Sequence, residues 1–111
     1  MHWSYYIAYF FGGALLTNAI PHLVSGLTGR SFQTPFAKPP GKGLSSSTVN
    51  ALWGWFNVIA GYLLVFHVGT FNLHSLADVG ALLGGGFLMS LHAARHFGQF
   101  HGGTTPLKPS A

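Results

Sequence analysis

The chain has 111 residues, a formal net charge of +4 and no cysteine, and only 5% of its residues are charged. Ordinary globular proteins contain about 25% charged residues, so a soluble domain of this composition would lack the polar groups needed to cover its surface. The hydrophobic fraction of 49% instead favours lipid as the solvent. The absence of cysteine excludes disulfides and thiolate metal sites. A positive net charge can indicate a nucleic-acid partner, but here the basic residues flank apolar runs, so we interpret them as signals of membrane topology and expect no nucleic-acid partner.

The first apolar run extends from about residue 3 to residue 21 and ends at Pro21. Proline in the interior of a helix removes a hydrogen bond and clashes with the preceding turn, so we expect a break or a kink here. The run ends in small residues, as a signal peptide does. A signal peptide begins with basic residues, however, and the first base of this chain is Arg30. We therefore expect a retained membrane helix.

Residues 22–48 form the first connection, in which an apolar first half is followed by a half rich in proline and glycine. We expect a short helical turn that lies in the membrane interface and then an ordered excursion. Basic side chains in this connection and near the end of the chain are predicted to contact lipid phosphates, at about 1 kcal/mol each. These predicted headgroup contacts are Arg30, Lys38, Lys42 and Arg95.

Two further apolar runs cover about residues 49–68 and 76–97. A helix of about 20 residues crosses a hydrocarbon core of about 30 Å, and neither run shows a polar face with a helical period. The sequence therefore predicts an all-α integral membrane protein, in which residues 1–111 form one membrane domain with three transmembrane helices.

The five Lys and Arg residues set the predicted orientation. With three spans, the connection 22–48 and the tail 98–111 lie on one side of the membrane, and all the bases fall on that side or at its boundary. The positive-inside rule makes this side cytoplasmic. We expect the N-terminus outside, the C-terminus in the cytoplasm, and the multi-pass chain in a bacterial inner membrane.

Four of the seven histidines, His22, His92, His96 and His101, gather at the predicted cytoplasmic side. His92 and His96 are one helical turn apart, and with His101 they could bind a divalent metal ion. His22, His92 and His96 could instead hold haem or a chlorophyll-type pigment, because bis-histidine ligation needs rings from two helices at one depth. The alternative is that these rings mark the polar end of the third helix, beside its C-terminal dipole.

Small and polar residues inside the runs predict close helix packing. Gly80 and Gly84 form a GxxxG pair on the third helix, and Asn57 lies near the middle of the second, where an amide usually bonds to another helix. Ser75 and Asp78 have the spacing of a capping box at the start of the third helix. The alternative for Asp78 is an outer proton or cation site shared with a nearby histidine.

The functional expectation follows from the scarcity of acids. Asp78 is the single acid in the chain, so no acid/base pair is available and catalysis is not favoured. We expect a non-catalytic accessory or structural subunit that packs within a larger membrane complex or against itself. A homo-oligomeric small transporter or channel is the first alternative. A membrane protein that binds metal or haem through the histidines is the second.

Overall fold

The computed structural model describes residues 2–104, which form three long helices and one two-stranded antiparallel ladder. In chain order the elements are α1 (Trp3–Leu27), β1 (Phe32–Gln33), β2 (Leu44–Ser45), α2 (Ser47–Phe66) and α3 (Leu76–His101). Each of the three helices is long and apolar enough to cross a membrane. The predicted helical fold with three candidate spans is thus confirmed at the level of the helices.

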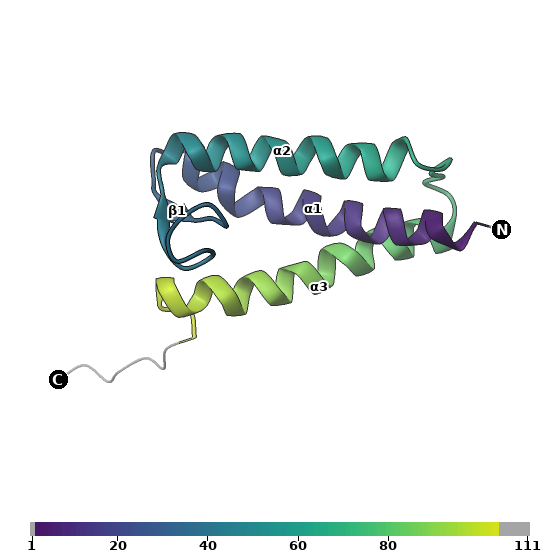
Figure 1. The fold of residues 1–111 in the computed structure, drawn as a ribbon. Coiled ribbons are helices and arrows are strands. Elements are labelled where there is room, and N and C mark those ends of the chain that lie inside the picture. The colour runs from purple at the N-terminus through teal and green to yellow at the C-terminus, as the bar shows by residue number, and fades with distance from the viewer. Residues whose placement is uncertain (1, 105–111) are drawn as a thin grey trace.

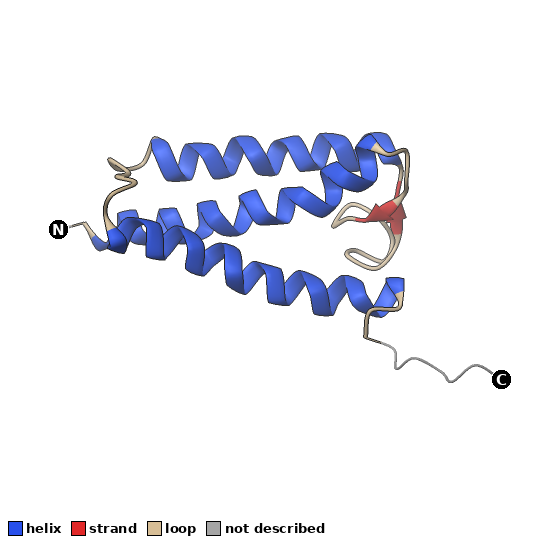
Figure 2. Ribbon diagram, turned by 180° about the vertical axis from the view of Figure 1, so that it is seen from behind, coloured by secondary structure: helices blue, strands red, loops and turns tan. Residues whose placement is uncertain are grey.

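The helix α1 lies between α2 and α3 and packs against both (Figure 1). Successive helices run in opposite directions, so the N-terminus and the connection between α2 and α3 lie at one end of the bundle. The connection between α1 and α2, residues 28–46, folds against the end of α3 at the other end, which we call the loop end (Figure 2). The apolar core is a seam along α1, formed by Ala8, Tyr9, Ala14 and Ala19 with Val65 of α2.

The helix α1 continues through Pro21 to Leu27, which corrects the expectation that a separate interfacial turn follows the proline. Gly29, at φ +76°, follows the helix and turns the chain away from its axis. Proline in a helix interior costs about 3 kcal/mol. The turn after Pro21 buries His22 and Ser25, and His22 forms a hydrogen bond there to Asn50 of α2.

The helix α3 runs four residues beyond the predicted end of its span at residue 97 and includes Gly98. Gly102, in the left-handed region at φ +83°, ends the helix. The predicted tail 98–111 therefore begins as helix. Residues 105–111 of that tail lie outside the described residues.

Glycine lets α1 and α3 approach closely at Gly13 and Gly85. A Cβ atom at Gly13 would collide with a backbone carbonyl oxygen of α3, and one at Gly85 with a backbone carbonyl oxygen of α1. The two helices therefore meet backbone to backbone. At Gly80 and Gly84 an added Cβ atom would meet no atom within 4 Å, so the GxxxG pair points away from the rest of the chain.

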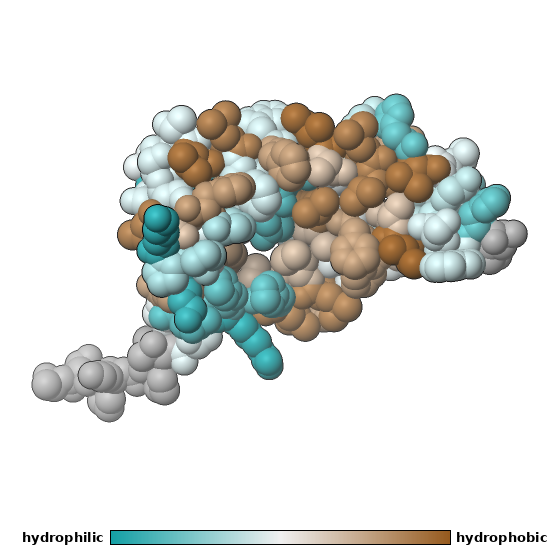
Figure 3. All heavy atoms as spheres, in the orientation of Figure 1, coloured by the Kyte–Doolittle hydropathy of each residue, from teal (hydrophilic) through white to brown (hydrophobic). Residues whose placement is uncertain are grey.

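Hydrophobic side chains cover the middle of the bundle, whereas hydrophilic side chains gather toward its ends (Figure 3). Many large apolar side chains are more than half exposed, among them Leu52, Phe56, Leu83 and Phe87. A water-soluble monomer rarely exposes so much contiguous apolar surface. Helices that face lipid are expected to have such a surface.

Candidate functional site

His22 is the buried polar centre of the loop end. Its side chain is 2% exposed, and its Nδ1 atom lies 2.8 Å from Oδ1 of Asn50 on α2. The Asn50 amide nitrogen donates to three backbone carbonyl oxygens at 3.0, 3.1 and 3.2 Å, so the amide oxygen is the atom that faces His22. Because that oxygen can only accept, His22 carries a proton on Nδ1 and donates it to Asn50.

Asn50 also fixes the excursion, residues 28–46, against α2. Its three carbonyl partners are those of Phe32, Ser45 and Ser46, which belong to the two strands and to the N-cap of α2. Gly41, at φ +73°, turns the chain back, and its amide donates to the carbonyl oxygen of Thr34 at 2.9 Å. The Thr34 hydroxyl in turn bonds to a serine hydroxyl of β2. The excursion is thus held in place by hydrogen bonds from polar side chains, whereas the sequence led us to expect its prolines to order it.

Two histidines of α3 bind the excursion from the other side. Nε2 of His96 lies 2.6 Å from the carbonyl oxygen of Gly41 and must donate, because a carbonyl only accepts. Nε2 of His101 lies 2.7 Å from Oε1 of Gln33, and its ring stacks on Phe32 with 4.8 Å between the ring centres. The last turns of α3 are therefore joined to the excursion by specific polar contacts.

A cavity of about 140 Å³ lies where the three helices and the excursion meet. It is lined by Asn18 and His22 of α1, Trp53 of α2, Gln33, Thr34, Pro35 and Gly41 of the excursion, and His96 and Phe97 of α3. Nε1 of Trp53 is buried and has no hydrogen-bond partner among the described residues. The polar side chains that meet in its wall make this cavity the candidate binding site of the chain.

Asn57 joins α1 to α2, in the way its position predicts. Its side chain is fully buried, its oxygen accepts from the Asn18 amide nitrogen at 3.2 Å, and its nitrogen donates to the carbonyl oxygen of Trp53 at 2.7 Å. Both polar ends of the Asn57 side chain are therefore paired within the chain. Packing accounts for this residue without a substrate.

The predicted histidine ligand sets come together only in part. His22 and His96 line one cavity, whereas His92 is exposed and stacks on His96 with 5.9 Å between the ring centres. Among the described residues, no three His, Asp or Glu side chains form a group that could hold a metal ion. The geometry therefore does not favour a divalent metal held by His92, His96 and His101.

Haem or a chlorophyll-type pigment is not favoured either. The cavity of about 140 Å³ is smaller than the roughly 300 Å³ at which sites for drug-sized ligands begin, and a tetrapyrrole is at least that large. The Nε2 atom of His96 is already a donor to Gly41, so it has no lone pair for iron. A pigment held by His22, His92 and His96 would require the excursion to leave its place.

The four basic side chains predicted to contact lipid headgroups are all exposed. Arg30, Lys38 and Lys42 belong to the excursion and Arg95 to the last two turns of α3, so all four lie at the loop end (Figure 1). The single acid, Asp78, begins α3 at the opposite end. Among the described residues the loop end therefore carries basic side chains and no acidic one, and such a surface attracts anionic lipid.

Asp78 has local partners at the opposite end. The Ser75 hydroxyl accepts from the Asp78 amide at 3.1 Å, which confirms Ser75 as the N-cap, and the Asp78 carboxylate accepts from the amide of Asn72 at 3.0 Å. The nearby His67 bonds instead to the Tyr62 hydroxyl. The structure thus supports a capping role for Asp78; its side chain lines one pocket with His2, but no hydrogen bond joins it to a histidine among the described residues.

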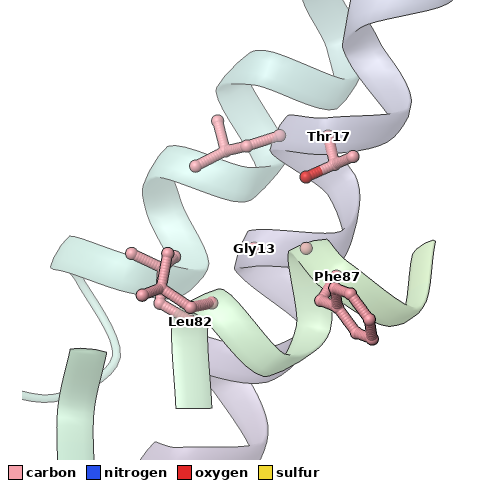
Figure 4. Close-up of a pocket in the computed structure, with 7 residues that line it drawn as sticks. Gly13, Thr17, Leu82 and Phe87 are labelled. Atoms are coloured by element: carbon pink, nitrogen blue, oxygen red, sulfur yellow. The ribbon is translucent and has the colours of Figure 1, made fainter. Parts of the chain in front are cut away.

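Two apolar grooves open on the outer surface of the bundle. One, of about 500 Å³, lies between α1 and α3, with Gly13, Thr17, Leu82 and Phe87 in its wall (Figure 4). The other, of about 520 Å³, lies between α2 and the excursion beside Phe36. Both lie on surfaces that lipid chains or another helix could cover. Neither gathers the polar groups that catalysis requires.

Sequence reasoning missed three residues of the cavity wall, Gln33, Thr34 and Trp53. Gln33 and Thr34 lie in a connection for which the sequence predicts order but no particular contacts, and nothing in the apolar run 49–68 marks Trp53 as part of a site. The available signal was Asn50, a polar residue at the start of an otherwise apolar run, since such an amide needs partners in a membrane protein.

Comparison of the chain with protein families, with curated proteins and with solved structures finds no match. The features that bear on function are therefore those of the chain itself. They are a cavity at the loop end with polar side chains in its wall, exposed basic side chains at the same end, and an outer face of α3 that no other part of the described chain covers.

Proposed function

We propose that the chain is a multi-pass protein of a bacterial cytoplasmic membrane, with its N-terminus outside and its loop end at the cytoplasm. The length and composition of the three helices support insertion. The four exposed bases of the excursion and of α3 lie at one end, which the positive-inside rule assigns to the cytoplasm.

Within this membrane the protein acts as a non-catalytic subunit that assembles through the outer face of α3. The observation that carries this proposal is the open space at Gly80 and Gly84, where an added Cβ atom would meet nothing within 4 Å. These glycines lie on the least buried of the three helices, while Gly85 on its inner face is already in contact with α1. Small residues that face outward let a second helix approach the backbone closely.

The partner that fits this face is another apolar helix, from a second copy of the chain or from a subunit of a larger complex. Affinity would come from close packing of backbones, because the Gly80–Gly84 face carries no hydrogen-bonding side chain. The transporter alternative requires self-association as its first step. The same experiment therefore tests that requirement.

Single-cysteine cross-linking in native membranes tests the proposal cleanly, because the chain has no cysteine of its own. Ala77→Cys places a thiol on an exposed position of α3 one turn before Gly80, and Ile59→Cys places one on the exposed face of α2 as a matched control. We expect oxidation to convert the Ala77→Cys chain into a homodimer, or a bifunctional reagent to link it to a larger membrane protein. The Ile59→Cys chain should remain uncross-linked.

A second substitution tests whether the glycine face itself is responsible. Gly84→Leu should reduce cross-linking through Ala77→Cys about fivefold, equivalent to ~1 kcal/mol of helix association. Helix content should stay unchanged, because nothing in the described chain contacts that position. A chain that stays monomeric and co-purifies with no other membrane protein would contradict the proposal.

A further inference from the structure

Asp78 is a buried carboxylate without a basic partner among the described residues. Its side chain is 9% exposed and accepts one hydrogen bond from them, donated by the backbone amide of Asn72. The described Lys and Arg side chains all lie at the loop end, the other end of the bundle. The N-terminus of α3 offsets about half of a unit charge, and a buried charge is costly unless it is paired. A cation beside Asp78 would supply the rest.

A pocket of about 230 Å³ lies beside this carboxylate, at the end opposite the loop end. Its wall consists of His2, Tyr5, Tyr6 and Tyr9 at the start of α1, Thr70 of the connection 67–75, and Asp78. Tyr9 is 2% exposed, and Tyr5 and Tyr6 are half-buried. Aromatic side chains therefore form most of the wall, and the carboxylate is its single acidic group.

Contacts within the chain hold these rings in place. Tyr5 and Tyr9 are one helical turn apart, so they lie on the same side of α1. A Cβ atom at Gly69 would lie 2.6 Å from the Tyr5 ring and 2.8 Å from the Tyr9 hydroxyl, and the glycine thus lets the connection lie against both. Tyr6 meets Tyr9 edge to face, with 6.2 Å between the ring centres. A ligand would therefore enter a wall that is already formed.

The composition of the wall selects among cations. A metal ion such as Ca²⁺ needs six or more oxygen ligands, and the described residues contain no group of three His, Asp or Glu side chains that could hold a metal ion. An ammonium group is attracted to the faces of tyrosine rings. A primary ammonium also has three donors, which the carboxylate and hydroxyl oxygens of the wall can accept, whereas a quaternary ammonium has none.

We propose that this pocket binds the primary ammonium group of a small organic amine or of a lipid headgroup. The ammonium donates to the Asp78 carboxylate and lies among the tyrosine rings, in the arrangement of a charge-assisted hydrogen bond beside aromatic faces. The volume of about 230 Å³ equals that of about eight water molecules at ~30 Å³ each, so the group and a short carbon chain fit. The site lies within one chain and does not depend on assembly through α3.

The ring resonances of ¹³C-labelled tyrosine in the full chain test this proposal, in micelles of an uncharged detergent. Ethylammonium chloride is the probe, potassium chloride is the control for charge, and ethanol is the neutral control of similar size. The signals are assigned by single Tyr→Phe variants. We expect ethylammonium to shift the signals of Tyr5, Tyr6 and Tyr9 saturably. The signal of Tyr62, which is exposed on α2 outside the pocket, should stay in place.

Added lipid distinguishes the two sources of the amine. Phosphatidylethanolamine carries a primary ammonium and phosphatidylglycerol does not. If the lipid is the source, the first should shift the same three signals and weaken the response to ethylammonium, and the second should do neither. If neither lipid shifts the signals while ethylammonium does, the ligand is a free amine.

Variants then locate the binding site. Asp78→Asn keeps a side-chain oxygen but removes the charge, and it should weaken ethylammonium binding at least about tenfold, the effect of a lost charge-assisted hydrogen bond. Tyr5→Leu removes one ring and should weaken binding about threefold, and it is the second test if Asp78→Asn fails to fold. Tyr62→Leu is the matched control outside the pocket and should bind as the wild type does.

Three results would overturn the proposal. If the three signals move only linearly with ethylammonium, or only together with that of Tyr62, the pocket binds no amine. If potassium chloride produces an equal saturable shift, the site takes an inorganic cation and the ammonium class is wrong. If Asp78→Asn folds and binds ethylammonium as tightly as the wild type, the carboxylate is not the partner of the amine.

Discussion

The two ends of the bundle use polar residues in opposite ways. At the loop end, hydrogen bonds join segments that are far apart in the sequence. These pairs are His22 with Asn50, His96 with Gly41, and His101 with Gln33. At the opposite end, side-chain bonds stay within six residues of the chain. The local pairs are His67 with Tyr62, His74 with Asn72, and Asp78 with Asn72.

The difference separates an end whose hydrogen bonds only cap and connect helices from an end that surrounds a cavity with polar side chains. The connection 67–75 links α2 to α3 and caps the start of α3, and hydrogen bonds between residues close in the sequence are enough for this. The excursion, residues 28–46, is longer than most connections between helices, and its buried Gln33 and Thr34 line a cavity. Buried polar networks are costly unless every member is paired, so the loop end is the region where the loss of one partner costs the most stability.

The largest effect is expected from Asn50→Leu at the loop end. The amide of Asn50 pairs with His22 and with three carbonyl oxygens, and an apolar side chain would leave the buried His22 ring nitrogen unpaired and remove the bonds to the carbonyl oxygens. We expect the free energy of unfolding to fall by about 3 kcal/mol, measured by denaturant titration in micelles with circular dichroism. Asn72→Leu at the opposite end is the matched control and should change stability by less than about 1 kcal/mol. Equal losses at both sites would remove the distinction between the ends.

A smaller effect is expected on lipid preference. Lys38 and Lys42 are exposed on the excursion, and each basic residue near an anionic surface contributes about 1 kcal/mol. The double variant Lys38→Gln with Lys42→Gln should therefore lower the preference for phosphatidylglycerol over phosphatidylcholine about thirtyfold, or ~2 kcal/mol, in native mass spectrometry. His67→Gln with His74→Gln, the equivalent change at the opposite end, should leave the preference intact. If both double variants behave alike, the basic loop end does not select lipid.

A still smaller effect is expected from His96→Ala, which removes the contact between α3 and Gly41. One lost hydrogen bond of ~1 kcal/mol should speed amide exchange in the excursion about fivefold, most visibly at Gly41 and Gly43, whose amides bond within it. His92→Ala is the control on the same helix, because the His92 ring is exposed and stacks only on His96. Unchanged exchange in His96→Ala would show that the excursion holds its place without α3.

The helices could be predicted from the sequence because a long apolar run with few charges can pair its backbone groups in lipid only by forming a helix. The start of α3 followed from Ser75, which caps it as expected. The end of α1 could not be predicted. Proline usually breaks or kinks a helix, but α1 continues past Pro21 and buries His22, the next residue. A pattern of glycines also cannot tell which of two adjacent faces of α3 meets α1. Gly85 faces inward, whereas Gly80 and Gly84 remain open.

The only residues of the site that could be predicted to lie together are those whose depth along the predicted helices is the same. His22 and His96 were expected at one depth, and they line the same cavity. Gln33 could not be placed, because the fold of the excursion depends on bonds from Asn50 and His96 that are 17 or more residues away in the sequence. Non-local bonds of this kind leave no local pattern of hydrophobicity or turn residues.

The smallest effect is expected at the opposite end, from Asp78→Asn. The amide keeps an oxygen that can accept from Asn72 and removes only the charge near the N-terminus of α3, a charge worth about 0.5 kcal/mol. Denaturant titration should therefore place this variant close to the wild type and well above Asn50→Leu. A loss as large as that of Asn50→Leu would mean that Asp78 does more for the fold than cap α3. The site shared with a histidine that the sequence also allows would then become the better account of how Asp78 stabilises this end.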